Sequence, residues 1–217
     1  MSSSNKEIYS ASRILDFYTK RLENFGGSSQ GVGWKNDEAQ LIRFEQLLKL
    51  IQDKSSFSIN DLGCGSGRLY KYMLSTGYSP MFYCGYDILE EMLLSAEKTL
   101  LPDPKVKLIK IESSADMEVS DYTVASGVFN VKCEAQEKEW MEHILSTINV
   151  MHERSKYGFA FNLLTKYSDT EYMQSYLYYA DPLFFFDFCK RNFSKNVALL
   201  HDYFQYDFTI IVRKTRI

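Results

Sequence analysis

Residues 59–67 read Ile-Asn-Asp-Leu-Gly-Cys-Gly-Ser-Gly, between a strand-like run at 56–59 and a helix-like run at 68–74. Glycine adopts positive φ without steric cost and lets a ligand approach the backbone closely. The free N–H groups at the start of the following helix can donate hydrogen bonds to ligand oxygens. An acidic residue and three alternating glycines at a strand-to-helix turn therefore predict a binding site for a small-molecule cofactor.

The glycine spacing argues against two common nucleotide-binding motifs. The dinucleotide fingerprint Gly-x-Gly-x-x-Gly requires glycine where this chain has Arg68 or, in the second register, Tyr70. A phosphate loop ends in Gly-Lys-Ser/Thr, whereas this segment ends in Gly-Arg-Leu at 67–69. The phosphate-loop interpretation fails, and a nicotinamide-dependent reductase remains an alternative that the spacing disfavours.

A second acidic residue follows at the distance that a nucleoside site requires. Residues 82–87 read Phe-Tyr-Cys-Gly-Tyr-Asp and predict the next strand, which ends in Asp87. An acid about 20 residues past the glycines can accept hydrogen bonds from both hydroxyls of a ribose. The same carboxylate could instead cap a helix at 88–99, or do both. Residues 121–130, Asp-Tyr-Thr-Val-Ala-Ser-Gly-Val-Phe-Asn, predict a further strand and the loop that follows it.

Together these segments resemble the class I S-adenosylmethionine-dependent methyltransferases, over about residues 34–213. The resemblance implies S-adenosylmethionine as cofactor, S-adenosylhomocysteine as product and no metal. It also implies that Ile88 packs on the adenine, that 114–117 lies near the adenine amino group, and that the N-terminal region covers the methionine end. There Arg43 could pair with the cofactor carboxylate, or it could be a surface arginine. The residues that we assign to the cofactor are Asp61, Gly63, Cys64, Gly65, Gly67, Asp87, Ile88, Asp116, Met117, Ser126, Trp34 and Arg43.

Alternation of strands and helices predicts an α/β fold with a doubly wound, mostly parallel sheet and helices on both faces. The last two predicted strands are too close for a helical crossover, which indicates a C-terminal antiparallel hairpin and seven strands in all. We expect one domain over 1–217, with 1–52 as an N-terminal helical cap. The predicted strands are 57–61, 82–86, 106–111, 121–126, 158–163, 196–201 and 207–213, and the predicted helices are 37–52, 67–76, 89–99, 136–152 and 181–191.

The amino-acid composition limits the classes of substrate and the compartment that we expect. The 217 residues carry 25 basic and 28 acidic side chains, a net charge of −3, and contain no run of five basic residues. Nucleic-acid binding relies on clustered Lys and Arg, so we do not expect DNA or RNA as the main substrate. The four cysteines are scattered, without metal-ligand or disulfide spacing, which favours a reducing cytoplasm. Neither a signal peptide nor a membrane-spanning run is recognisable in the sequence.

Candidates for the chemistry follow the strands that end near the cofactor. His201 is our first candidate base, because its ordinary pKa suits proton removal near neutral pH; a structural histidine is the alternative. Asn130, after the fourth strand, and Tyr203, near His201, could orient the acceptor, although loop or packing roles are open for both.

A tyrosine-rich segment at 165–180 could close over the substrate, because tyrosine offers apolar area and a hydroxyl at low entropy cost. A dimer surface is the alternative, and we leave the oligomeric state open, including a homodimer. The residues that we assign to the substrate are Asn162, Tyr176, Tyr179 and Tyr206.

We therefore expect methyl transfer to a small-molecule acceptor, with oxygen as the acceptor atom because a candidate base is present. Residues 33–35, 125–132 and 201–209 resemble a group of small, mostly uncharacterised bacterial methyltransferases. That group suggests a sugar, phosphorylated or polysaccharide-precursor acceptor without defining one. Methyl transfer to nitrogen or to a carboxyl group stays open, as does a protein that binds the cofactor without catalysis.

Overall fold

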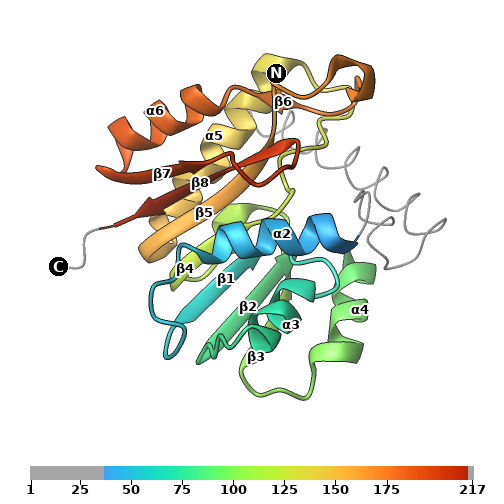
Figure 1. The fold of residues 1–217 in the computed structure, drawn as a ribbon. Helices are drawn as coiled ribbons and strands as arrows, with labels where there is room; N and C mark the ends of the chain where they lie inside the picture. Colours follow the sequence, from blue (N-terminus) through green and yellow to red (C-terminus); the bar gives the residue numbers. More distant parts are fainter. Residues whose placement is uncertain (1–36, 215–217) are drawn as a thin grey trace.

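The computed structural model describes residues 37–214, and eight strands in this part of the chain form one sheet (Figure 1). The strand order is β3-β2-β1-β4-β5-β8-β7, and β6 pairs with the end of β5. Neighbours from β3 to β5 pair in parallel, whereas β8 runs antiparallel to both β5 and β7. The strands are β1 (Ser58–Leu62), β2 (Phe82–Asp87), β3 (Val106–Lys110), β4 (Ser120–Ala125), β5 (Ser155–Thr165), β6 (Tyr179–Ala180), β7 (Asn196–Leu200) and β8 (Asp207–Arg213).

Helices cover both faces of the sheet, because successive strand residues point to opposite faces and both sets are apolar. On one face α2 (Asp37–Leu48), α3 (Arg68–Ser75) and α4 (Glu90–Leu100) pack on a core that includes Phe44, Tyr70 and Ile59. On the other face α5 (Glu137–Glu153) and α6 (Pro182–Asn192) pack on a second core around Trp140 and Phe161. Short 3₁₀ turns form at η1 (Ser114–Asp116) and η2 (Thr170–Tyr172). Among the helices between residues 37 and 214, none has the length and hydropathy needed to cross a bilayer.

The predicted fold class is confirmed, including the mostly parallel sheet and the antiparallel C-terminal hairpin. The count of seven strands misses β6, which has two residues and is too short to show a periodic pattern. The helix predicted at 37–52 ends earlier, at Leu48. Leu50 and Ile51 are buried in the same core, so their burial extends the apolar pattern beyond the helix.

The switch in strand order falls between β1 and β4. Strand β1 pairs with β2 on one side and with β4 on the other, so the loops after these strands meet at one edge of the sheet. The loop after β1 is anchored there, because Gly63 and Cys64 donate N–H bonds of 2.8 and 3.0 Å to the Tyr86 carbonyl on β2. This edge is where a ligand site is expected in an open α/β sheet.

Gly67 joins this loop to α3 in a conformation and a space that only glycine fits. Its φ is +74°, and a Cβ at this position would lie 2.3 Å from Cδ1 of Leu100 on α4. A side chain would therefore strain the backbone and also push α4 away from the loop.

Replacing Gly67 with alanine should destabilise the protein more than replacing Gly77, which has a φ of +83° but open space around it. Gly77→Ala meets only the left-handed backbone penalty, about 1–2 kcal/mol. Gly67→Ala adds an overpacking penalty of about 1–3 kcal/mol. Urea unfolding of the two variants measures the difference, and equal losses would contradict the contact with Leu100.

Candidate cofactor site

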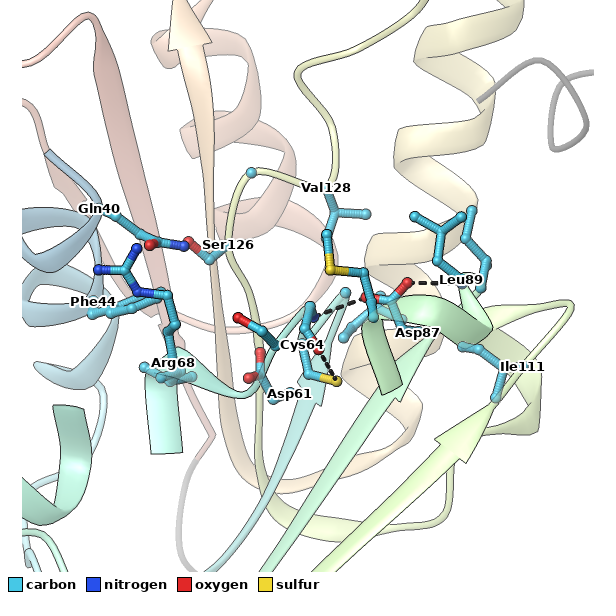
Figure 2. Close-up of a pocket in the computed structure, with 18 residues that line it drawn as sticks. Gln40, Phe44, Asp61, Cys64, Arg68, Asp87, Leu89, Ile111, Ser126 and Val128 are labelled. Atoms are coloured by element: carbon cyan, nitrogen blue, oxygen red, sulfur yellow. Dashed lines mark hydrogen bonds between the residues drawn. The ribbon is translucent and has the colours of Figure 1, made fainter. Parts of the chain in front are cut away.

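A cavity opens at the carboxyl ends of β1, β2 and β4, between these strands and the N-terminal half of α2 (Figure 2). The cavity has a volume of about 160 Å³ and is partly open to solvent. Its walls come from α2 (Gln40 and Phe44), the loop after β1 (61–66, with Arg68 and Leu69 beyond it), the end of β2 and the start of α4 (87–89 and Met92), Ile111 after β3, and the loop after β4 (126–128).

Asp87 lies at the end of β2 with 8% of its surface exposed. Its Oδ2 accepts the Gly65 N–H at 2.8 Å, and its Oδ1 accepts the Leu89 N–H at 2.9 Å. Burial raises the pKa of this carboxyl, and the two backbone bonds act in the opposite direction. A carboxylate oxygen has lone pairs for more than one bond, so both oxygens can still accept from a ligand.

Asp87 can therefore serve both predicted roles, as an acceptor for ribose hydroxyls and as a cap for the helix that follows β2. The carboxylate fastens the turn that leads into α4, because Leu89 directly precedes that helix. It also lines the cavity and holds the glycine loop through Gly65.

Asp61 brings a second buried carboxyl to the same cavity, at the end of β1. It is 2% exposed, and the Tyr83 hydroxyl donates a 2.6 Å hydrogen bond to its Oδ2. Burial raises the pKa of Asp61 to about 7; the Tyr83 bond lowers it and the nearby Asp87 charge raises it. Asp61 therefore exchanges a proton near neutral pH in the ligand-free protein.

The loop after β4 forms the opposite wall. Asn162 on β5 holds this loop, because its Oδ1 accepts the Gly127 N–H at 2.7 Å. Val128 fills the space over Gly63, where a Cβ would lie 2.6 Å from Val128 Cγ2, so glycine is required there for packing as well as for its φ of +71°. The glycine loop and the loop after β4 are thus fitted to each other.

Some residues that we predicted for the cofactor lie elsewhere. The Asp116 side chain is exposed and accepts the Glu112 and Ser113 N–H groups at 3.3 and 3.2 Å, in a capping box at η1. Met117 is 2% exposed in the core. Neither lines the cavity, and Ile111 reaches it from the end of β3 instead.

Arg43 also does not line the cavity. Its guanidinium forms a buried salt bridge with Asp207 at the start of β8 and donates to the Ala39 carbonyl at 2.9 Å. The predicted pairing with a ligand carboxylate is therefore replaced by a pairing within the protein. Trp34 lies outside the described residues, as does most of the predicted 1–52 cap.

The structure does not bring the three catalytic candidates to the cavity. His201 is exposed at the end of β7, with its ring centroid 6.1 Å from those of Tyr167 and Phe208. Strand β7 is three strands from β4, roughly 14 Å across the sheet, far beyond the reach of a hydrogen bond to a group at β4. Tyr203 is buried with its hydroxyl 3.0 Å from Thr209 Oγ1.

Asn130 holds loops together at the same edge of the sheet. Its Oδ1 accepts the Leu164 N–H at 3.2 Å, and its carbonyl accepts the Tyr178 N–H at 2.8 Å. Asn130 thus links the loop after β4 to the end of β5 and to β6, which gives it a structural role in this structure.

The four residues predicted for the substrate also lie outside the cavity lining. Asn162 is fully buried behind the loop after β4, as described above. The Tyr179 hydroxyl accepts the Gln174 N–H at 3.0 Å, and the Tyr206 hydroxyl donates to Asp169. The Tyr176 carbonyl accepts the Lys132 and Cys133 N–H groups at 3.0 Å. These bonds connect the 165–180 segment to its neighbours, and its closing as a lid stays a prediction.

Gln40, Phe44 and Arg68 line the cavity but were absent from our predicted site. Gln40 and Phe44 lie one helical turn apart and so share a face of α2, a signal that the helical period already contained. Arg68 follows the glycine motif directly, but its role depends on a partner in α2, Asp37, at 2.6 Å. No group of three or more His, Cys, Asp or Glu side chains between residues 37 and 214 is arranged to hold a metal ion.

Comparisons with known proteins agree with this geometry. No family model matches the chain. A Mycobacterium tuberculosis protein named "Putative methyltransferase Rv1506c" is 44% identical over 167 residues, covering 77% of this chain and 99% of that protein. Magnesium protoporphyrin IX methyltransferase from Synechocystis with bound S-adenosylhomocysteine has a TM-score of 0.64 at 15% identity, covering 94% of this chain and 99% of that one. The DhpI complex with S-adenosylhomocysteine also has a TM-score of 0.64, at 11% identity, and the match covers 95% of this chain and 98% of that one. The small RNA methyltransferase HEN1 gives 0.61 at 17% identity, covering 81% of this chain and 25% of that one.

A relative at 44% identity along nearly its whole length shows the family. The chain belongs to the class I S-adenosylmethionine-dependent methyltransferases, and it is an enzyme of that class. Its cofactor is S-adenosylmethionine. When bound, this cofactor supplies an electrophilic methyl group on a sulfonium sulfur. The residues at the cavity fit it, since Asp87 offers two acceptor oxygens at one end and unpaired polar atoms lie at the other.

Asp87→Ala should weaken S-adenosylhomocysteine binding by well over tenfold, because it removes a charged acceptor at the cavity wall. Asp116→Ala is the matched control: it removes an exposed carboxylate that also caps backbone N–H groups but lies outside the cavity. Isothermal titration calorimetry compares the two. Unchanged affinity in Asp87→Ala would refute the assignment of the carboxylate to the cofactor.

The thermal stability of the ligand-free protein should fall as the pH rises from about 5 to 8. The folded-state pKa of Asp61 is about 7, above its ordinary value of 3.8, so the folded protein binds more protons than the unfolded chain in this window. Asp61→Asn keeps an acceptor for the Tyr83 hydroxyl and removes the titration, so its stability should fall less. Melting temperatures across this pH range measure both curves, and parallel curves would contradict the raised pKa.

Proposed function

We propose that the enzyme transfers the methyl group of S-adenosylmethionine to an oxygen of a small, uncharged, hydroxyl-bearing molecule. The observation that carries the charge and the size of this acceptor is the surface beside the cavity, at the carboxyl ends of β5 and β7. It consists of residues 166–172 and 201–206, and we call it the rim. The two rim segments are joined where the Thr165 N–H donates to the Tyr206 carbonyl at 3.0 Å.

Aromatic side chains cover the rim and remain exposed. Tyr167 and Tyr172 are each 60% exposed, Tyr206 is 41% exposed, and Phe204 is fully exposed at a φ of +53°. The Tyr172 and Tyr206 rings lie 6.3 Å apart. Exposed apolar surface that gathers in one place marks a binding surface, and tyrosine adds a hydroxyl that can bond a polar ligand. A strained, fully exposed Phe204 is consistent with such a use.

The charge of the rim favours an uncharged acceptor. Asp169, Glu171 and Asp202 are exposed on it, whereas Lys166 forms a salt bridge with Asp181 at 2.8 Å. This acidic surface would repel phosphate groups. The rim therefore supports a neutral acceptor over the phosphorylated one that the sequence left open, and it gives no support for a nucleic-acid substrate.

The position of the rim sets the size of the acceptor. The rim begins one strand away from β4, where Ser126 ends the cavity, and extends over β8, two strands away. These separations are roughly 5 and 10 Å, so a molecule with one or two rings would reach from the cavity to the rim tyrosines.

We also propose that the reaction takes place in the cytoplasm. Cys64, Cys84 and Cys189 are buried as thiols, which suits a reducing compartment. The oligomeric state stays open, including a homodimer.

The acceptor class can be tested with S-adenosylmethionine labelled in its methyl group. The protein should transfer label from it to a bacterial small-molecule extract, into a fraction that an anion exchanger does not retain. The labelled product should survive mild alkali, because a methyl ether does so and a methyl ester does not. The Asp87→Ala variant, which lacks the protein carboxylate that we assign to cofactor binding, serves as the blank.

Other outcomes would contradict the proposal in distinct ways. Label in RNA or in the retained anionic fraction would mean a charged acceptor. Alkali-labile label would mean a carboxyl acceptor, and label on nitrogen would be recognised by mass spectrometry. A protein that binds the cofactor without labelling any fraction would be a binding protein.

A further inference from the structure

Two buried polar atoms at the cavity have no hydrogen-bond partner among residues 37–214. They are Oε1 of Gln40 on α2 and Oγ of Ser126 after β4, and both residues line the cavity. Gln40 is 7% exposed, so its side chain is more than nine-tenths buried. Buried polar groups are almost always paired, and leaving one unpaired costs stability. Two such atoms at one end of a ligand cavity therefore indicate that a ligand completes their bonds.

A positive charge lies at the same end. Figure 2 shows the guanidinium group of Arg68 turned toward Gln40, with Ser126 beside Gln40 and with Asp87 and Leu89 at the other end of the cavity. Arg68 is bound on its outer side by Asp37, 2.6 Å from Nη1. Asp37 is largely exposed, so water screens that pair and Arg68 keeps donors for a second anionic group.

We propose that Gln40, Arg68 and Ser126 bind the amino-acid end of S-adenosylmethionine. That end carries one carboxylate and one ammonium group. The Arg68 guanidinium matches the carboxylate, and the unpaired oxygens of Gln40 and Ser126 match the ammonium donors. Asp61 lies along the cavity between the two ends and adds a negative charge for the same ammonium group.

The buried pair of Arg43 and Asp207 explains why α2 can hold Gln40 in place. Arg43 is one turn beyond Gln40, and its salt bridge fixes that turn to the start of β8. The Arg68–Asp37 pair joins the first turn of α2 to the first turn of α3. One end of the segment that carries Gln40 is thus attached to α3 and the other to strand β8, so Arg43 and Asp207 are positioning residues.

Two nucleosides that differ only in the proposed contact test the assignment. S-adenosylhomocysteine carries the amino-acid end, whereas 5′-methylthioadenosine lacks it. Gln40→Ala and Arg68→Met should each lower the affinity for S-adenosylhomocysteine about tenfold or more. Both variants should bind 5′-methylthioadenosine like the unchanged protein, within about twofold. Calorimetric titration gives both affinities without any acceptor substrate.

Control variants distinguish the loss of this one contact from damage to the whole cofactor site or to the fold. Asp87→Ala should weaken both nucleosides, because it acts on the part that they share. Gln46→Ala should change neither: Gln46 is a second buried glutamine of α2, whose Oε1 accepts a 2.5 Å bond from Lys49 away from the cavity. Arg68 is partly exposed, so its variant should fold even if Gln40→Ala does not. Equal losses for the two nucleosides, or no loss for S-adenosylhomocysteine, would overturn the proposal.

Discussion

Two carboxyl groups buried in one cavity are the constraint on which the site depends. Asp61 and Asp87 are 2% and 8% exposed, burial raises the pKa of both, and the Asp87 charge raises the pKa of Asp61 further. A buried charge needs partners, and here they are the Tyr83 hydroxyl and two backbone N–H groups. One of those N–H groups belongs to Gly65, so the glycine loop takes its position partly from the acid on the next strand. The cavity is therefore prepared for a ligand that brings hydroxyl and ammonium donors.

A second buried charge pair connects this cavity to the far half of the sheet. Arg43 on α2 and Asp207 on β8 are both buried, and burial raises the pKa of Asp207 while Arg43 opposes that shift. Such a pair adds little net stability, but breaking it by removing one partner is strongly destabilising. Its value here is geometric, because it sets α2 across β5 and β8 with Gln40 over the cavity. The same strands carry the rim, so one helix relates the two surfaces.

The sequence predicted most of the fold because its signals are local. Alternating apolar residues identify the long strands, and the glycines with Asp87 identify the turn after β1 and the end of β2. Within the candidate site, the predicted residues that line the cavity are Asp61, Gly63, Cys64 and Gly65 of the glycine motif, Asp87 and Ile88 at the end of β2, and Ser126, whereas Gly67 lies outside the lining. These positions follow directly from strand ends.

The predicted residues that lie outside the cavity lining are positioned by contacts that local sequence patterns do not show. Arg43 is 164 residues from Asp207 in the chain, and no local pattern shows that the two meet. Asp116 is acidic and near the right strand, but a capping box with Ser113 satisfies it locally. His201 follows a predicted strand correctly, yet the strand order puts β7 at the edge of the sheet. Sequence patterns give strand ends, whereas the order of the last three strands decides which loops reach the cavity.

The cavity and the rim differ in how they are built, and this explains why one could be assigned and the other only proposed. The cavity is formed by strand ends and helix starts, whose geometry is shared with methyltransferases only 11 and 15% identical to this chain. The rim is formed by connections, the part of a domain where sequence and length vary most freely. Packing of the sheet does not require its acidic and aromatic side chains. The acceptor is therefore to be sought in the chemistry of these connections, since the fold itself serves acceptors of many kinds.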